Sequence, residues 1–143
     1  MSIARIIEGR NAADIITCDV EMTVRQAVNL LAGRRIGAMP VMEQGQVAGV
    51  FSERDVIYRL DSNGPGILET RVGDVMTAPA VTVSSDSSID EALSMMTKRR
   101  IRHLPVVDQG RMIGIVSIGD LVKYRIDAIE SEAAAMRDYI RTA

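Results

Sequence analysis

Two stretches of the chain carry nearly the same pattern: GAMPVMEQGQVAGVFSERDV at residues 37–56 and RHLPVVDQGRMIGIVSIGDLV at residues 102–122. Shifting the sequence by 65 residues aligns 17–59 with 82–124 without a gap, and twelve positions are identical. The chain therefore contains two copies of one supersecondary unit. We expect the two copies to pack on each other, because neither is long enough to bury both faces of its own sheet.

Each copy carries signals for a strand, a helix, a β-hairpin of two strands and a second helix, in that order. Thr23-x-x-Gln26 and Ser88-x-x-Glu91 are capping boxes, and the apolar residues behind them recur at helical spacing. Two short apolar segments follow, joined by a turn in which glycine tolerates a positive φ. The predicted strands are 39–42, 47–51, 104–107 and 112–116.

The connections can be assigned from turn and cap residues. Ser-x-x-Asp at Ser52–Asp55 and at Ser117–Asp120 begins the second helix of each copy. The segment 61–66, which is rich in Asp, Asn, Gly and Pro, is a linker. Residues 72–76 are expected to form a short helical turn that leads into the second copy.

The full pattern, present twice at a fixed offset, resembles a pair of CBS domains (a Bateman module) of the stand-alone bacterial kind. The resemblance covers about residues 10–126 and divides the chain into repeats at 10–62 and 72–126, with an extension at 127–143. It implies an α/β fold, an α+β sandwich with a pseudo-twofold axis between the repeats. It also implies adenosine-containing ligands in clefts between the repeats, and a dimer.

Composition excludes several other classes of protein. The chain of 143 residues is 47% hydrophobic and 25% charged, with a formal charge of −2, as in an ordinary soluble domain. The chain has no strong excess of positive charge with which to bind the phosphate backbone of a nucleic acid. No apolar run is long enough to cross a membrane. A single cysteine and the lack of an export signal predict a cytoplasmic protein without a disulfide framework.

Asp55 and Asp120 are the first candidates for ligand binding. A carboxylate at a helix start can accept hydrogen bonds from both hydroxyls of a ribose, and the resemblance assigns this role to the Asp of each motif. The alternative is an acid favoured only by the helix dipole. Ser52 and Ser117 cap the same helices, and Gly119 lets a ligand approach the backbone where its counterpart Arg54 brings a charge.

The two clefts are expected to differ chemically. Arg102 and His103 precede Pro105, whereas Gly37 and Ala38 precede Pro40 in the first copy. A guanidinium suits a phosphate, and the resemblance places such residues near the phosphate of a nucleotide whose ribose is held by the opposite repeat. We therefore pair Ser52 and Asp55 with Arg102 and His103, and Ser117 and Asp120 with Gly37 and Ala38. The alternative is a solvated Arg–His pair at a strand edge. The resemblance also implies that the adenine of the ligand is bordered by Thr17, Ile36, Thr82 and Ile101. The alternative is that the isoleucines are core residues and the threonines strand residues.

His103 does not indicate a metal site or a catalytic centre. A structural zinc site needs about four protein ligands, and the sequence offers no partner histidine. The Ser and Asp of the motif recur in both copies, whereas only one copy has a histidine. Such recurrence favours binding over catalysis, so the chain is predicted not to be an enzyme and to need no cofactor.

The last helix continues beyond the repeat with a heptad-like seam. Its apolar residues are spaced by alternating steps of four and three, and the other face is charged. They are Val122, Ile126, Ile129, Ala133, Met136 and Ile140. The seam either packs on its own domain or joins two chains, and we predict a homodimer.

The sequence thus predicts a sensor of AMP, ATP or an NAD-type adenylate that signals to an effector protein in trans. The alternative is a structural dimerisation module with degenerate pockets.

Overall fold

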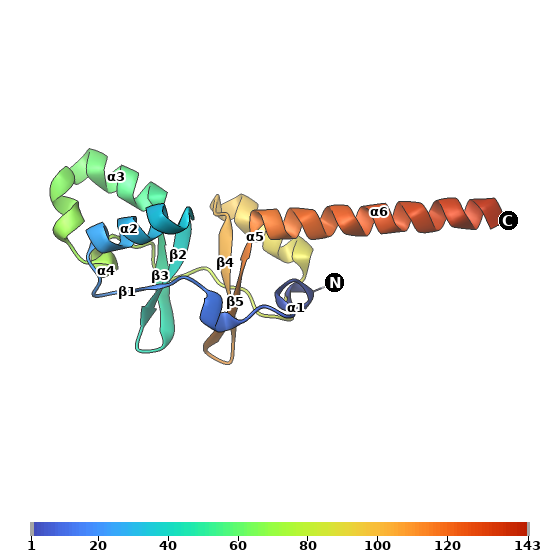
Figure 1. The fold of residues 1–143 in the computed structure, drawn as a ribbon, viewed down its shortest axis with the longest axis horizontal. Coiled ribbons are helices and arrows are strands. Elements are labelled where there is room, and N and C mark those ends of the chain that lie inside the picture. The colour runs from blue at the N-terminus through green and yellow to red at the C-terminus, as the bar shows by residue number, and fades with distance from the viewer. Residues whose placement is uncertain (1, 143) are drawn as a thin grey trace.

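The computed structural model describes residues 2–142 as two α/β repeats side by side, with one long helix projecting from the second (Figure 1). The first repeat contains β1 (Cys18–Asp19), α2 (Val24–Arg34), β2 (Ala38–Glu43), β3 (Gln46–Ser52) and α3 (Glu53–Asn63). β2 and β3 form an antiparallel hairpin, and β1 pairs in parallel with β2. The linker adds a 3₁₀ helix, η2 (Pro65–Glu69), and α4 (Val72–Val75).

The second repeat reproduces the first at the 65-residue offset. It contains α5 (Ile89–Arg99), β4 (His103–Asp108), β5 (Arg111–Ser117) and α6 (Ile118–Thr142). The bridge between Val83 and Val106 takes the place of the β1–β2 pairing. The predicted fold class, with its two repeats, is confirmed.

Local sequence accounts for the hairpins and the helix starts. Gln44 and Gly45, and likewise Gln109 and Gly110, all have a positive φ, so each turn has two left-handed residues. This geometry matches the twist of an antiparallel hairpin. The sequence predicts a positive φ only at the glycines, and the preceding glutamines adopt it as well.

The helix starts also follow their capping motifs, but at α5 the Ser88 hydroxyl accepts from the backbone of Glu91 without the reciprocal bond that the predicted capping box requires. The Thr23 hydroxyl accepts from the backbone of Gln26, whose side chain accepts from the backbone of Thr23 in return. Ser52 and Asp55 form the same reciprocal box at the start of α3.

The segment that precedes each repeat packs on the other repeat. The N-terminal helix α1 (Ile3–Ile7) buries Ile3 in the core of the second repeat. Val72 and Val75 of α4 lie in the core of the first repeat, although 72–126 was assigned to the second. The 3₁₀ helix η1 (Ala12–Asp14) continues the N-terminal segment along β5. Each core therefore includes residues from the segment that precedes the other repeat.

Helix α6 uses only its first turns to pack on its own domain. Leu121 is fully buried, and Tyr124 packs against the second core. The seam residues face elsewhere: Val122 is 43% exposed, Ile129 52% and Ile140 66%. The hypothesis that the seam packs on its own domain is therefore wrong.

None of the helices within residues 2–142 is long and apolar enough to cross a membrane.

Substitution of Gly49 tests how closely the linker backbone packs against β3. A Cβ at Gly49 would lie 2.6 Å from the backbone oxygen of Thr77, whereas one at Gly33 in α2 would meet nothing within 4 Å. We expect Gly49→Ala to lower the free energy of unfolding by ~1–3 kcal/mol. Gly33→Ala should leave it unchanged or raise it by ~0.5–1 kcal/mol. Urea denaturation measures both, and equal stability of the two variants would contradict the close approach.

Candidate functional site

A cleft of about 920 Å³ lies between the two repeats. The first repeat contributes the end of α2, the start of β2 and the start of α3. The second contributes the end of α5 and the first residue of β4, and the linker contributes Thr77 and residues 79–81. A volume of this size can hold a ligand the size of a nucleotide.

Nine of the sixteen predicted site residues line this cleft: Ile36, Gly37, Ala38, Ser52, Arg54, Asp55, Ile101, Arg102 and His103. The predicted grouping of Ser52 and Asp55 with Arg102 and His103 is therefore present in space. The remaining seven do not line it: Thr17, Pro40, Thr82, Pro105, Ser117, Gly119 and Asp120. Gly37 and Ala38 lie in the same cleft as Asp55, not in a separate cleft with Asp120.

Asp55 has one oxygen committed to the helix cap and one directed to the linker. Oδ2 accepts from the backbone N–H and the hydroxyl of Ser52, at 2.9 and 3.1 Å. Oδ1 accepts from the hydroxyl of Thr77 at 2.9 Å. A neutral hydroxyl is exchanged for another hydroxyl at little cost, so Oδ1 remains available to a ligand.

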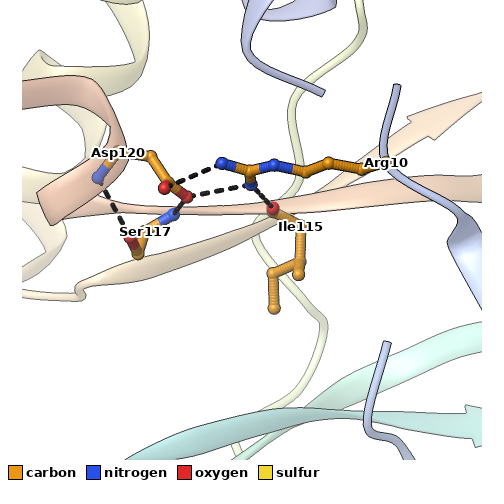
Figure 2. A network of polar contacts seen from close by, with 4 residues as sticks. All are labelled: Arg10, Ile115, Ser117 and Asp120. Carbon is orange, nitrogen blue, oxygen red and sulfur yellow. Dashed lines mark hydrogen bonds and ion pairs between the residues drawn. The ribbon is translucent and has the colours of Figure 1, made fainter. Parts of the chain in front are cut away.

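Asp120, the counterpart of Asp55, is bound by a guanidinium (Figure 2). Arg10 donates from Nη2 to Oδ1 at 2.9 Å and from Nη1 to Oδ2 at 3.2 Å. Nη1 also donates to the backbone oxygen of Ile115 at 3.4 Å, and Oδ2 accepts from the backbone N–H of Ser117. Such a bidentate ion pair is a strong form of carboxylate recognition by arginine.

The charges at Asp120 fix its ionised form. Burial alone would raise the pKa of Asp120, but the hydrogen bonds from Arg10 and Ser117 outweigh burial and lower that pKa. The pKa of Arg10 is raised in turn, chiefly by its hydrogen bond to Asp120. The carboxylate that could receive a ribose in the second repeat is thus already occupied within the chain.

The cleft wall contributed by the second repeat combines a free charge with a neutral imidazole. Burial lowers the pKa of His103, while the charge of Asp120 opposes that shift and the charge of Arg102 reinforces it. His103 is therefore neutral at pH 7, and the exposed Arg102 is one of five arginines that line the cleft, with Arg35, Arg54, Arg99 and Arg100.

Arg54 connects the repeats across the cleft. Its Nη1 donates to the backbone oxygen of Arg100 at 2.7 Å. Arg100 is the left-handed residue that ends α5, so its carbonyl has no partner within the helix. Arg54 thus ties the start of α3 to the end of α5.

Sequence reasoning missed Thr77 as a residue of this cleft. Thr77 lies in the linker, and its position 65 residues earlier is Ala12, so the repeat offered no signal for it. The hydroxyl reaches Asp55 because the backbones of Val50 and Thr77 pair as a short antiparallel bridge.

The remaining walls of the cleft are largely apolar. Val28, Leu31, Ile36, Ile101 and Val81 form much of this surface. Apolar walls with a few convergent polar groups are typical of small-molecule sites. Within residues 2–142 no group of three His, Cys, Asp or Glu side chains could hold a metal ion.

The fold is that of two tandem α/β repeats with a cleft between them. The chain belongs to the CBS domain family, whose model matches residues 11–62 and 72–127.

Three relatives illustrate the similarity. The mitochondrial CBS domain-containing protein CBSX3 of Arabidopsis thaliana is 34% identical over 87% of this chain, which spans 63% of that protein. The CBS domain-containing protein YhcV of Bacillus subtilis is 32% identical over 84% of this chain and 83% of its own length. A solved structure of a protein with CBS domains from Burkholderia ambifaria is 36% identical, covers 89% of this chain and 95% of its own, and has a TM-score of 0.80.

His103, the only histidine of the chain, reports directly on these charges. We expect its pKa, followed by NMR of the ring protons, to lie below 6.5. Asp120→Asn should lower the pKa further, because it removes one of the two carboxylate charges, with that of Glu53, that raise it. Arg102→Ala should raise the pKa, because it removes a charge that lowers it. A titration midpoint at or above 6.5, or shifts in the same direction in both variants, would contradict this placement.

Proposed function

We propose that the chain is a non-enzymatic regulatory module that binds an adenosine nucleotide in the cleft between its repeats. AMP, ATP and an NAD-type adenylate all fit this chemistry, and no cofactor is required. The observation that carries the proposal is the convergence of the Asp55 carboxylate and the Arg102 guanidinium, from opposite repeats, on one cleft with apolar walls.

Each part of an adenylate has a matching group in this cleft. Asp55 Oδ1 exchanges the hydroxyl of Thr77 for a ribose hydroxyl. Arg102 pairs with the phosphate, and His103 contributes a neutral hydrogen-bonding group. The adenine packs between Ile36 and Ile101, which line the cleft from the two repeats.

Relatives with the same fold support an adenosine-type ligand. CBSX2 is solved in complex with AMP, at 22% identity and a TM-score of 0.74. The CBS domain pair of MJ0100 is solved with 5-methylthioadenosine and S-adenosyl-L-methionine, also at 22% identity and 0.74. All three ligands contain adenosine, although identity at this level establishes only the shared fold.

Similarity to an enzyme does not bring catalysis to this chain. Inosine-5'-monophosphate dehydrogenase of Mycobacterium leprae is 34% identical over 119 residues, but these make up only 21% of that enzyme. The groups around the cleft suit binding: a capped carboxylate, several guanidinium groups and a neutral imidazole. We propose binding without turnover.

A binding module must pass its signal on. A ligand that contacts both repeats stabilises one relative arrangement of the repeats. It therefore shifts the population of conformations toward that arrangement. We propose that a homodimer in the cytoplasm transmits this change to an effector protein in trans.

The second candidate is a structural dimerisation module with degenerate pockets. The ion pair between Arg10 and Asp120 favours this second candidate, because one of the two repeated carboxylates is already bound by an arginine of the same chain. Nucleotide that co-purifies with the protein separates the two candidates. The chain has no tryptophan, so absorbance near the adenine maximum, followed by mass spectrometry, would be easy to detect.

We expect Asp55→Asn to weaken AMP binding about 10- to 150-fold, because hydrogen bonds to a charged group contribute ~1.5–3 kcal/mol. Asp120→Asn is the matched control, because its carboxylate is held by Arg10, and it should bind AMP like the wild type. Calorimetric titration with AMP and 2'-deoxy-AMP measures both variants. Wild-type protein that does not distinguish the two sugars, together with normal binding by Asp55→Asn, would remove the ribose assignment.

We expect Arg102→Ala to weaken AMP at least tenfold and to leave adenosine nearly unaffected, because only AMP carries the phosphate. Arg111→Ala, another exposed arginine of the second repeat that does not line the cleft, is the control. The same titrations measure both ligands. Equal losses for AMP and adenosine would mean that Arg102 supports the cleft rather than the phosphate.

A further inference from the structure

Helix α6 carries an apolar seam that nothing within residues 2–142 covers. The helix runs from Ile118 to Thr142, and most of it projects beyond the second repeat (Figure 1). Every residue of the seam is exposed: Val122, Ile126, Ile129, Ala133, Met136 and Ile140. The exposed fraction is 50% at Ile126 and 60% at Met136.

The seam and the face that packs on the domain lie on different sides of the helix. Leu121 and Tyr124 define the domain face. At about 100° per residue, the seam lies about 120° around the helix from this face. A second helix can therefore lie along the seam without displacing α6 from its own repeat.

The charged residues beside the seam select the orientation of that second helix. With Ile126, Ala133 and Ile140 at the a positions, Arg125 and Glu132 occupy g positions, and Lys123, Glu130 and Arg137 occupy e positions. In a parallel pair, each g residue faces the e residue five positions further along the partner. Arg125 then faces Glu130 of the second copy, and Glu132 faces Arg137, so both pairs have opposite charges.

An antiparallel pair places like charges together. With the seams aligned about their centre, each e residue faces an e residue and each g residue a g residue. Lys123 then faces Arg137 of the second copy, while Glu130 and Glu132 each face their own equivalents. Like charges in direct contact disfavour this arrangement.

We propose that two copies of this chain join through a parallel two-stranded coiled coil of α6, along Val122 to Ile140. The two repeat pairs then lie at the same end of the coil. This inference concerns the interface of the homodimer and is independent of ligand binding in the cleft.

The first test is the mass of the full chain in solution, by light scattering at micromolar concentration. We expect the wild type at twice the 15.6 kDa of one chain. Ile129→Asp places a charge in the seam and should reduce the mass to that of one chain. Ser131→Asp adds the same charge on the opposite face of the helix and should leave the dimer intact.

Several outcomes of this test would overturn the proposal. They are a monomeric wild type, a dimeric Ile129→Asp variant, and equal dissociation by both substitutions. Ile129 belongs to neither core, so circular dichroism should show a folded protein in both variants.

The second test determines orientation, and it stands even if Ile129→Asp fails to fold. Ile140→Cys should form a disulfide-linked dimer under mild oxidation, because the two copies of residue 140 meet only in the parallel arrangement. Asp138→Cys, on the opposite face, should remain uncrosslinked. Cys18 does not interfere, because burial raises the pKa of its thiol to about 11.

A contrary pattern would identify the antiparallel arrangement. There, residue 140 faces residue 122 of the second copy. A disulfide that forms only when Ile140→Cys is mixed with Val122→Cys would overturn the parallel orientation.

Discussion

Two backbone hydrogen bonds between Val50 and Thr77, at 3.0 and 2.9 Å, hold the linker against β3. They require that residue 49 has no side chain, because the linker backbone passes where a Cβ would lie. The N-terminal segment binds the second repeat in a comparable way, with the N–H groups of Ile3 and Ala4 donating to Ser87 and Ser85. Each repeat is thus completed by the segment that precedes the other, and the cleft between them follows from this exchange.

The exchange also makes the two repeated carboxylates unequal. The linker brings the neutral hydroxyl of Thr77 to Asp55, whereas the N-terminal segment brings the guanidinium of Arg10 to Asp120. A hydroxyl can be replaced by a ligand hydroxyl with little change in electrostatic energy. Replacing a two-pronged ion pair exposes two charges that must both be satisfied again. Two sites that are nearly identical in sequence therefore have different access to a ligand.

Helix α6 extends from the ion-paired carboxylate of the second repeat to the exposed surface of the molecule. Its first turn holds Asp120, its next turns pack Leu121 and Tyr124 on the second core, and the rest carries the seam. Asp120 and the base of the proposed coiled coil thus lie on one helix. Across the cleft, the hydrogen bond from Arg54 to the backbone oxygen of Arg100 joins the start of α3 to the end of α5.

The sequence by itself determined the order and type of the main elements and the four residues of the two Ser-x-x-Asp motifs. These depend on local interactions: capping groups three residues apart, left-handed turn residues between two strands, and apolar spacing along one helix. The 65-residue repeat presents the same local signals twice, so both copies form the same elements.

Only the tertiary structure decided which segment covers which repeat, which carboxylate stays accessible and which face of α6 remains open. Arg10 and Asp120 are 110 residues apart, and Thr77 lies outside the repeated unit, so neither contact has a local signature. A 3.5-residue period shows that a helix has an apolar stripe but not what covers it. That outcome depends on how the completed cores, with Leu121 already buried, orient the rest of the helix.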